Sequence, residues 1–191
     1  MAAAERNEES RRLFRQQVSE LARERLVFID ESGFHLAMTR RYGRARRGAR
    51  ASYTVPTNRG LNLSVISSVR LRGVVASLSV KGAIDTPIFD TYINELLLPQ
   101  IHARDVVLLD NLPVHLASHI EAMVASRKGV VMWLPSYSPD FSPIEPFWSK
   151  VKTSVRGKEP RTEPELNTAL TAAINAVSPD DIDGWFRHCG Y

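Results

Sequence analysis

The sequence predicts an α/β domain in which a mixed sheet is flanked by helices. The expected elements run strand, strand, strand, helix, strand, helix, strand, helix, an order that suits helices packed on a sheet. Two short apolar runs, LVFID (26–30) and VVLLD (106–110), are typical of buried strands. A chain of 191 residues with 43% hydrophobic content can bury the core of one such domain.

An amphipathic helix is expected ahead of the first strand. Phe14, Val18 and Leu21 recur there at helical spacing among charged residues. We interpret residues 1–24 as a helical extension that packs on a domain spanning residues 25–191.

The remaining elements follow from apolar segments separated by helix and strand breakers. Strands are expected where apolar runs are bounded by Gly, Pro or polar residues: 26–30, 61–69, 73–80, 106–110 and 130–134. Helices are expected where apolar residues recur at helical spacing: 84–98, 113–126, 144 onwards and 163–177. The stretch PSYSPDFSP (135–143) is predicted to be a loop, because proline lacks an amide donor. Trp185 and Phe186 provide an apolar anchor near the end.

Two aspartates, Asp30 and Asp110, end the two most apolar runs. Each is expected where a buried strand leaves the sheet, and ligands of open α/β sheets gather there. If the two strands are neighbours, the carboxylates resist joint ionisation unless a cation lies between them. Oxygen ligands favour Mg²⁺ or Mn²⁺ over zinc. Taken alone, either aspartate would more often cap a turn or a helix.

Glu145 is the third candidate acid, at a helix start just after the proline-rich loop. Its carboxylate gains there from the helix dipole, although a lone first-turn glutamate would be unremarkable. The functional interpretation therefore depends on the three acids together. Lys152 and Arg156 share its side of the helix and are candidates for phosphate contact.

One short segment carries most of the positive charge. The formal net charge is +4, and six arginines without a compensating acid lie between residues 39 and 50; without them the chain would carry −2. These arginines suit a polyanion such as DNA, although an arginine-rich loop can also simply face water. They are Arg40, Arg41, Arg44, Arg46, Arg47 and Arg50.

Composition excludes several classes of protein. The single cysteine, Cys189, allows no internal disulfide, so a reducing compartment is expected. The first residues, MAAAERNEESRRLFRQQ, are too charged for a signal peptide, and no apolar run approaches membrane-spanning length. We therefore expect an intracellular protein without a membrane partner. His115 and His119 have the spacing of a zinc pair, but Leu116 replaces the glutamate of a metalloprotease motif, which favours packing.

Several separated motifs carry a family resemblance. YSPDFSPIEPFWSKVK (137–152) follows VVLLDN, with 34 residues between Asp110 and Glu145. This arrangement resembles the mariner superfamily of DDE transposases. The segments FIDESGF (28–34), RRYGRARRG and GWFRHCGY are most similar to its bacterial branch, the insertion sequence 630 family. Phe141 and Ser142 depart from the Leu-Asn that the family usually has before Pro143.

The resemblance implies a ribonuclease H-like fold and catalytic residues Asp30, Asp110 and Glu145. It also implies two Mg²⁺ or Mn²⁺ ions, in-line displacement at phosphorus, and cleavage and strand transfer of DNA. Asp30 would bind both ions, Asp110 one, and Glu145 the other. Implied partners are transposon ends and target DNA, a second copy of the chain on DNA, and a separately encoded helix-turn-helix subunit, because residues 1–24 are too short to contain one. The bacterial cytoplasm, at the nucleoid, is the implied location.

Two alternatives remain open at this point. A catalytically silent transposase remnant would bind DNA or a partner subunit without cutting. A ribonuclease H-like nuclease acting on RNA hybrids or Holliday junctions would use the same metal chemistry, but the SPIEPFWSK segment favours a transposase.

Overall fold

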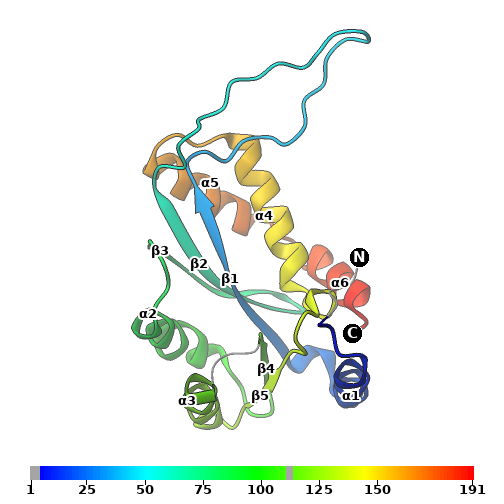
Figure 1. Ribbon diagram of the computed structural model, residues 1–191. Helices are drawn as coiled ribbons and strands as arrows, with labels where there is room; N and C mark the ends of the chain where they lie inside the picture. The colour runs from blue at the N-terminus through cyan, green and yellow to red at the C-terminus, as the bar shows by residue number, and fades with distance from the viewer. Residues whose placement is uncertain (1–4, 111–113) are drawn as a thin grey trace.

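The computed structural model contains a five-stranded mixed sheet with helices on both faces (Figure 1). It describes residues 5–110 and 114–191, with the side chains of 114–117 excepted. The strands are β1 (Leu26–His35), β2 (Asn62–Arg70), β3 (Gly73–Lys81), β4 (Val106–Leu109) and β5 (Val130–Trp133). Their order across the sheet is β3-β2-β1-β4-β5. β1 pairs antiparallel with β2 and parallel with β4, so the predicted mixed sheet is confirmed.

Six α-helices surround the sheet in the part of the chain that the structure describes. They are α1 (Glu8–Ser19), α2 (Thr86–Thr91), α3 (Val114–Ala125), α4 (Ile144–Lys158), α5 (Glu163–Asn175) and α6 (Pro179–Cys189). A 3-10 turn, η4 (Pro139–Phe141), precedes α4. None of the described helices is long and apolar enough to cross a membrane.

The sheet separates two cores, and the alternation of β1 decides which side chains enter each. Phe28 belongs to the core shared with α4, α5 and α6, whereas Val27 and Ile29 belong to the core shared with α3. Because side chains of a strand alternate between faces, Asp30 lies on the same side as Phe28. That side is the one covered by α4.

The expectation that Asp30 ends its strand is wrong. β1 continues to His35, because β2 stays paired with it up to the contact between His35 and Asn62. β4 pairs with β1 only as far as Phe28. Asp30 therefore lies inside a strand but beside the point where the neighbouring strand stops, while Asp110 follows β4 directly as expected.

The predicted helix over residues 84–98 is not a continuous α-helix. Asp85 caps α2 by accepting a hydrogen bond from the Ile88 amide (3.0 Å). After Thr91 the chain widens into a π-helical turn over Tyr92–Leu97 and then tightens into a 3-10 turn. The Tyr92 hydroxyl, fully buried, donates to Ser68 Oγ (2.8 Å), so a tertiary contact overrides the local preference for a regular helix.

Other boundaries differ by a few residues. The first helix ends at Ser19 instead of 24, and the helix expected over 163–177 ends at Asn175. The closing segment forms α6, in which Phe186 is fully buried and Trp185 partly buried.

Candidate active site

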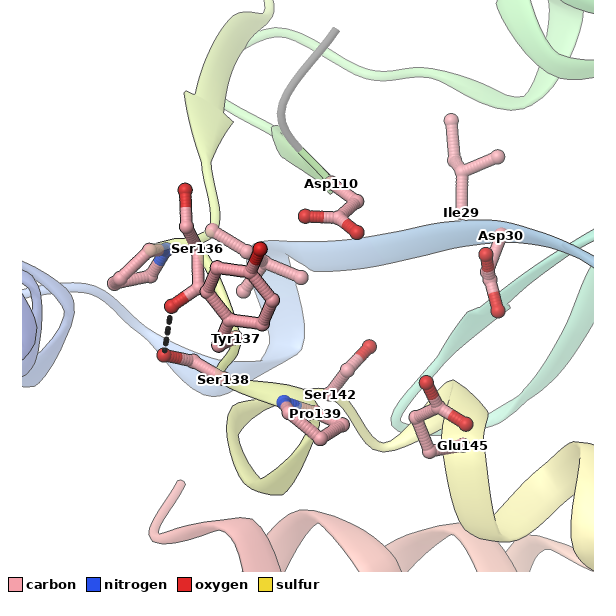
Figure 2. Close-up of a pocket in the computed structure, with 11 residues that line it drawn as sticks. Ile29, Asp30, Asp110, Ser136, Tyr137, Ser138, Pro139, Ser142 and Glu145 are labelled. Carbon is pink, nitrogen blue, oxygen red and sulfur yellow. Dashed lines mark hydrogen bonds between the residues drawn. The ribbon is translucent and has the colours of Figure 1, made fainter. Parts of the chain in front are cut away.

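Three acidic side chains that are distant in sequence line one pocket of about 350 Å³. Asp30 comes from β1, Asp110 from the residue after β4, and Glu145 from the first turn of α4. Figure 2 shows the carboxylates of Asp30 and Glu145 extending toward each other across the pocket, with Asp110 on the sheet side. The structure thus brings together the three acids that the sequence singled out.

The strand register explains why the two aspartates meet. Phe28 of β1 lies opposite Leu108 of β4 in a parallel pair. Asp30 and Asp110 each follow two residues later, so both lie on the α4 side and at the same level of the sheet. The third acid is brought in by a helix start: Pro143 is the N-cap of α4, and Glu145 follows in its first turn. Proline suits this place because its amide is not needed there.

The environment of Asp30 disfavours its charged form. The pKa of Asp30 is raised to about 6, mainly by burial and also by the charges of Glu145 and Asp110. Hydrogen bonds donated by the Glu31 amide and by Trp148 Nε1 (3.0 Å to Oδ2) act in the opposite direction. The influence of both other acids on Asp30 indicates that the three charges share one electrostatic environment.

This shift makes the stability of the metal-free protein depend on pH. The pKa of Asp30 is raised from 3.8 to about 6, so the folded state binds the proton more tightly than the unfolded state. The contribution of the Asp30 carboxyl to the free energy of unfolding is complete below pH 4 and is lost as the pH rises through 6. We expect Asp30→Asn to stabilise the protein at pH 7 by up to about 3 kcal/mol but to change little at pH 4. Urea unfolding in EDTA measures this, and an equal difference at both pH values would contradict it.

The donor set of the pocket fits a hard divalent cation. Its lining includes three carboxylates and the Tyr137 hydroxyl, and neither histidine nor cysteine is among its lining residues. A cation would offset the repulsion that raises the pKa of Asp30. Among the described side chains, however, no three acidic, histidine or cysteine groups are already arranged to hold one ion.

Basic side chains border the acids along α4. Burial lowers the pKa of Lys152; the charge of Arg156 also lowers it, whereas Glu145 and Asp30 raise it. The pKa of Arg156 is lowered by burial and by Arg41. Lys152 therefore lies within electrostatic range of Glu145 and Asp30, and with Arg41 and Arg156 it forms a basic border along α4.

Arg41 belongs to a long loop, residues 36–61, that links β1 to β2 and projects away from the sheet (Figure 1). A turn closed by a hydrogen bond from the Ala49 amide to the Arg46 carbonyl (2.9 Å) lies far along it. Side chains throughout residues 40–60 are exposed. The predicted basic segment is therefore accessible, and it includes Arg40, Arg41, Arg44, Arg46, Arg47 and Arg50.

The base of this loop is fastened to the end of α4. Arg161 Nη1 donates to the carbonyls of Leu36 (3.0 Å) and Met38 (3.2 Å). Arg40 donates to the Gly157 carbonyl (3.3 Å), and the Tyr53 hydroxyl bonds to Glu159. The same helix thus carries Glu145 at one end and supports the arginine-rich loop at the other.

Sequence reasoning missed several neighbours of the site. Trp148 belongs to the core, with 3% exposure, and its indole also donates a hydrogen bond to Asp30. Its position three residues after Glu145 places both on one side of α4, a spacing that could have indicated this role. His35 and Arg59 also lie near the basic border. Burial lowers the pKa of His35 most, and the charges of Arg59 and Arg156 lower it as well.

The two histidines considered for zinc have different outcomes. His119 Nε2 lies 3.2 Å from Asp90 Oδ2, an ion-pair contact between α3 and α2 when the imidazole is protonated. The side chain of His115 lies outside the described residues.

Comparison with known proteins gives one family match. The family model described as DDE superfamily endonuclease matches residues 25–167. No curated protein matches the chain.

Several solved structures share the fold. The Mos1 transposase paired-end complex with left transposon end has a TM-score of 0.79 at 17% identity, covering 99% of this chain and 61% of that one. The Mos1 mariner paired end complex with Mn gives 0.75 at 17% identity, covering 96% and 57%. The Mos1 transposase catalytic domain with Raltegravir and Mn gives 0.64 at 14% identity, covering 95% and 84%. The chain therefore spans about three-fifths of the longer transposase chains, and the expected ribonuclease H-like fold is confirmed.

Proposed function

Because this chain belongs to the DDE superfamily endonuclease family, we propose that it is the catalytic domain of a DNA transposase that cuts DNA and joins it to a target. The observation that carries this proposal is the pocket in which Asp30, Asp110 and Glu145 meet. The resemblance of the segment 137–152 to the mariner superfamily supports the same function, and that of 28–34 favours its insertion sequence 630 branch. Residues 25–191 would form the catalytic domain, and residues 1–24 an extension.

Each acid has a distinct part in this proposal. Bound Mg²⁺ or Mn²⁺ would supply Lewis-acid stabilisation of the phosphate and activation of a water or 3′-hydroxyl nucleophile. Asp30, whose electrostatic environment includes both other acids, would bind two ions, while Asp110 and Glu145 would each complete one of the two sites. The Trp148 indole holds Asp30 Oδ2 in place. Structural neighbours of the chain include Mos1 complexes with Mn and with Mg.

The basic residues would hold the DNA backbone beside these acids. Arg41, Lys152 and Arg156 adjoin the pocket, and the other loop arginines continue the positive surface outward. This arrangement suits a nucleic acid whose phosphates run from the loop to the carboxylates. Structures of Mos1 transposase contain a transposon end or a strand transfer complex. Transposon ends, target DNA and a second copy of this chain are the proposed partners, together with a helix-turn-helix subunit.

The second candidate is a catalytically silent remnant that binds DNA without cutting it. It differs from an active enzyme in making no use of bound metal.

Metal binding therefore tests the proposed function without knowledge of the DNA sequence. We expect Mn²⁺ at tenfold its dissociation constant to raise the melting temperature by roughly 3–5 °C, because the ion binds only the folded carboxylates. Asp110→Asn should abolish most of this rise. The control Asp180→Asn removes an exposed first-turn acid of α6 and should keep it. An unmoved melting curve of the wild type at millimolar Mn²⁺ would overturn the proposed site and favour the remnant.

A further inference from the structure

A buried arginine on α1 reaches the turn that precedes the proposed catalytic glutamate. Arg11 is 1% exposed, and its Nη1 and Nη2 donate to the two carboxylate oxygens of Asp140 at 3.0 Å and 2.6 Å. Such a forked pair fixes orientation as well as distance. The Arg11 guanidinium also lies 4.0 Å from the centre of the Phe141 ring. Arg11 of α1 therefore contacts two successive residues of η4, Asp140 and Phe141.

Further contacts hold Phe141 in place beside Arg11. Phe14, one turn after Arg11, stacks on Phe141 with ring centres 5.3 Å apart. The Tyr191 hydroxyl donates to the Phe141 carbonyl (2.6 Å). Arg11 holds the pKa of Asp140 below its usual value, so the pair is ionic at neutral pH.

The chain between Phe141 and Glu145 has little freedom to absorb movement. The amides of Phe141 and Ser142 bond to the carbonyls of Ser138 and Pro139, both at 3.0 Å. The Glu145 amide bonds to the Ser142 carbonyl at 3.1 Å, and Pro143 between them has a fixed φ of −59°. Ser142, Pro143 and Ile144 are buried. A displacement of η4 is therefore transmitted to the first turn of α4.

We propose that Arg11 is a positioning residue that sets the place of Glu145 in the pocket through its forked contact with Asp140. The effect of Arg11 on DNA cleavage rests on the proposed function, but the positioning of Glu145 is a property of the fold. α1 thereby acts as a brace of the active site in addition to covering the core. Asp140, which is not one of the three proposed catalytic acids, is the residue through which the brace acts.

Simple stabilisation would have a different signature. Arg11 is 1% exposed and Asp140 49%, so a pair that acted only by stabilising the whole fold would protect amides throughout α4, because breaking it leaves a buried charge. A brace instead limits local opening of the segment that it holds. The two roles therefore differ in which amide protons they protect.

Amide hydrogen exchange by NMR separates these roles. In Arg11→Lys, which keeps the charge but loses the fork, we expect the amides of Phe141, Ser142 and Glu145 to exchange about tenfold faster. The amides of Val151 and Val155, deeper in α4, should keep their rates. The control Arg12→Lys alters an exposed pair with Glu9 on the same helix and should change neither group.

A second measurement links the brace to catalysis. In metal-dependent DNA cleavage, Arg11→Lys and Asp140→Asn should each lower kcat about tenfold and leave KM for DNA unchanged, because misplacement of a catalytic group acts on the reacting step. The proposal would be overturned if the amides near Glu145 exchanged at wild-type rates in Arg11→Lys, or if exchange accelerated equally at Val151 and Val155. It would also be overturned if local exchange accelerated while kcat stayed unchanged. A wild type that cuts no DNA would instead overturn the proposed function, and exchange alone would then decide whether Arg11 positions Glu145.

Discussion

Replacing Glu145 by Gln is expected to lower the rate of DNA cleavage by at least about a thousandfold. The substitution keeps the size of the side chain but removes the charge that would complete one metal site. Folding should be nearly unaffected, because a first-turn glutamate contributes only a few tenths of a kcal/mol through the helix dipole. DNA binding should also survive, since the basic border is unchanged.

The matched control is Glu163→Gln, the same change at a first-turn glutamate of α5. Its ion pair with Lys81 (2.9 Å) is largely exposed and contributes little. Both variants are assayed on one nicked DNA substrate carrying the transposon end, with the recognition subunit supplied in trans. Metal-dependent cleavage that persists undiminished in Glu145→Gln would refute its role as the third catalytic carboxylate.

The second large effect is expected from the arginine-rich loop. Replacing Arg44, Arg46 and Arg47 together by Gln should weaken DNA binding roughly a hundredfold at 0.15 M salt. Each phosphate contact releases a condensed counterion, so the slope of log K against log salt should become shallower by roughly three units. Titrations of fluorescent DNA at several salt concentrations measure both quantities.

A control triple variant separates local contact from total charge. Arg72, Arg104 and Arg127 are exposed, and none of them lines the acidic pocket. Their replacement by Gln removes the same charge and should leave the slope nearly unchanged. If the loop variant has the wild-type slope, its arginines only face water.

The fold was largely predictable because its strands and helices are encoded locally. The apolar runs at 26–30 and 106–110 predicted β1 and β4, and the proline-rich loop predicted the start of α4 at Ile144. The extension of β1 to His35 was not predictable from the run itself, since it depends on pairing with β2. The π-helical turn at Tyr92 likewise depends on a buried hydrogen bond to Ser68.

The three acids of the site could be found from sequence, but their surroundings could not. Asp110 and Glu145 stand out by the motifs around them, and the structure places both with Asp30 in one pocket. The bonds from Trp148 to Asp30 and from Arg11 to Asp140 span 118 and 129 residues of sequence, so the acceptor of each bond lies far outside the local pattern around its donor.

Cleavage by the wild-type protein tests the central claim most directly. The protein, with the recognition subunit, is incubated with DNA carrying the transposon end in Mg²⁺, in Mn²⁺ and in EDTA. Glu145→Gln, purified identically, measures any contaminating nuclease. Our account predicts strand cleavage that requires Mg²⁺ or Mn²⁺ and leaves a 3′-hydroxyl able to join target DNA. Absence of cleavage in both metals, or cleavage that continues in EDTA, would contradict it.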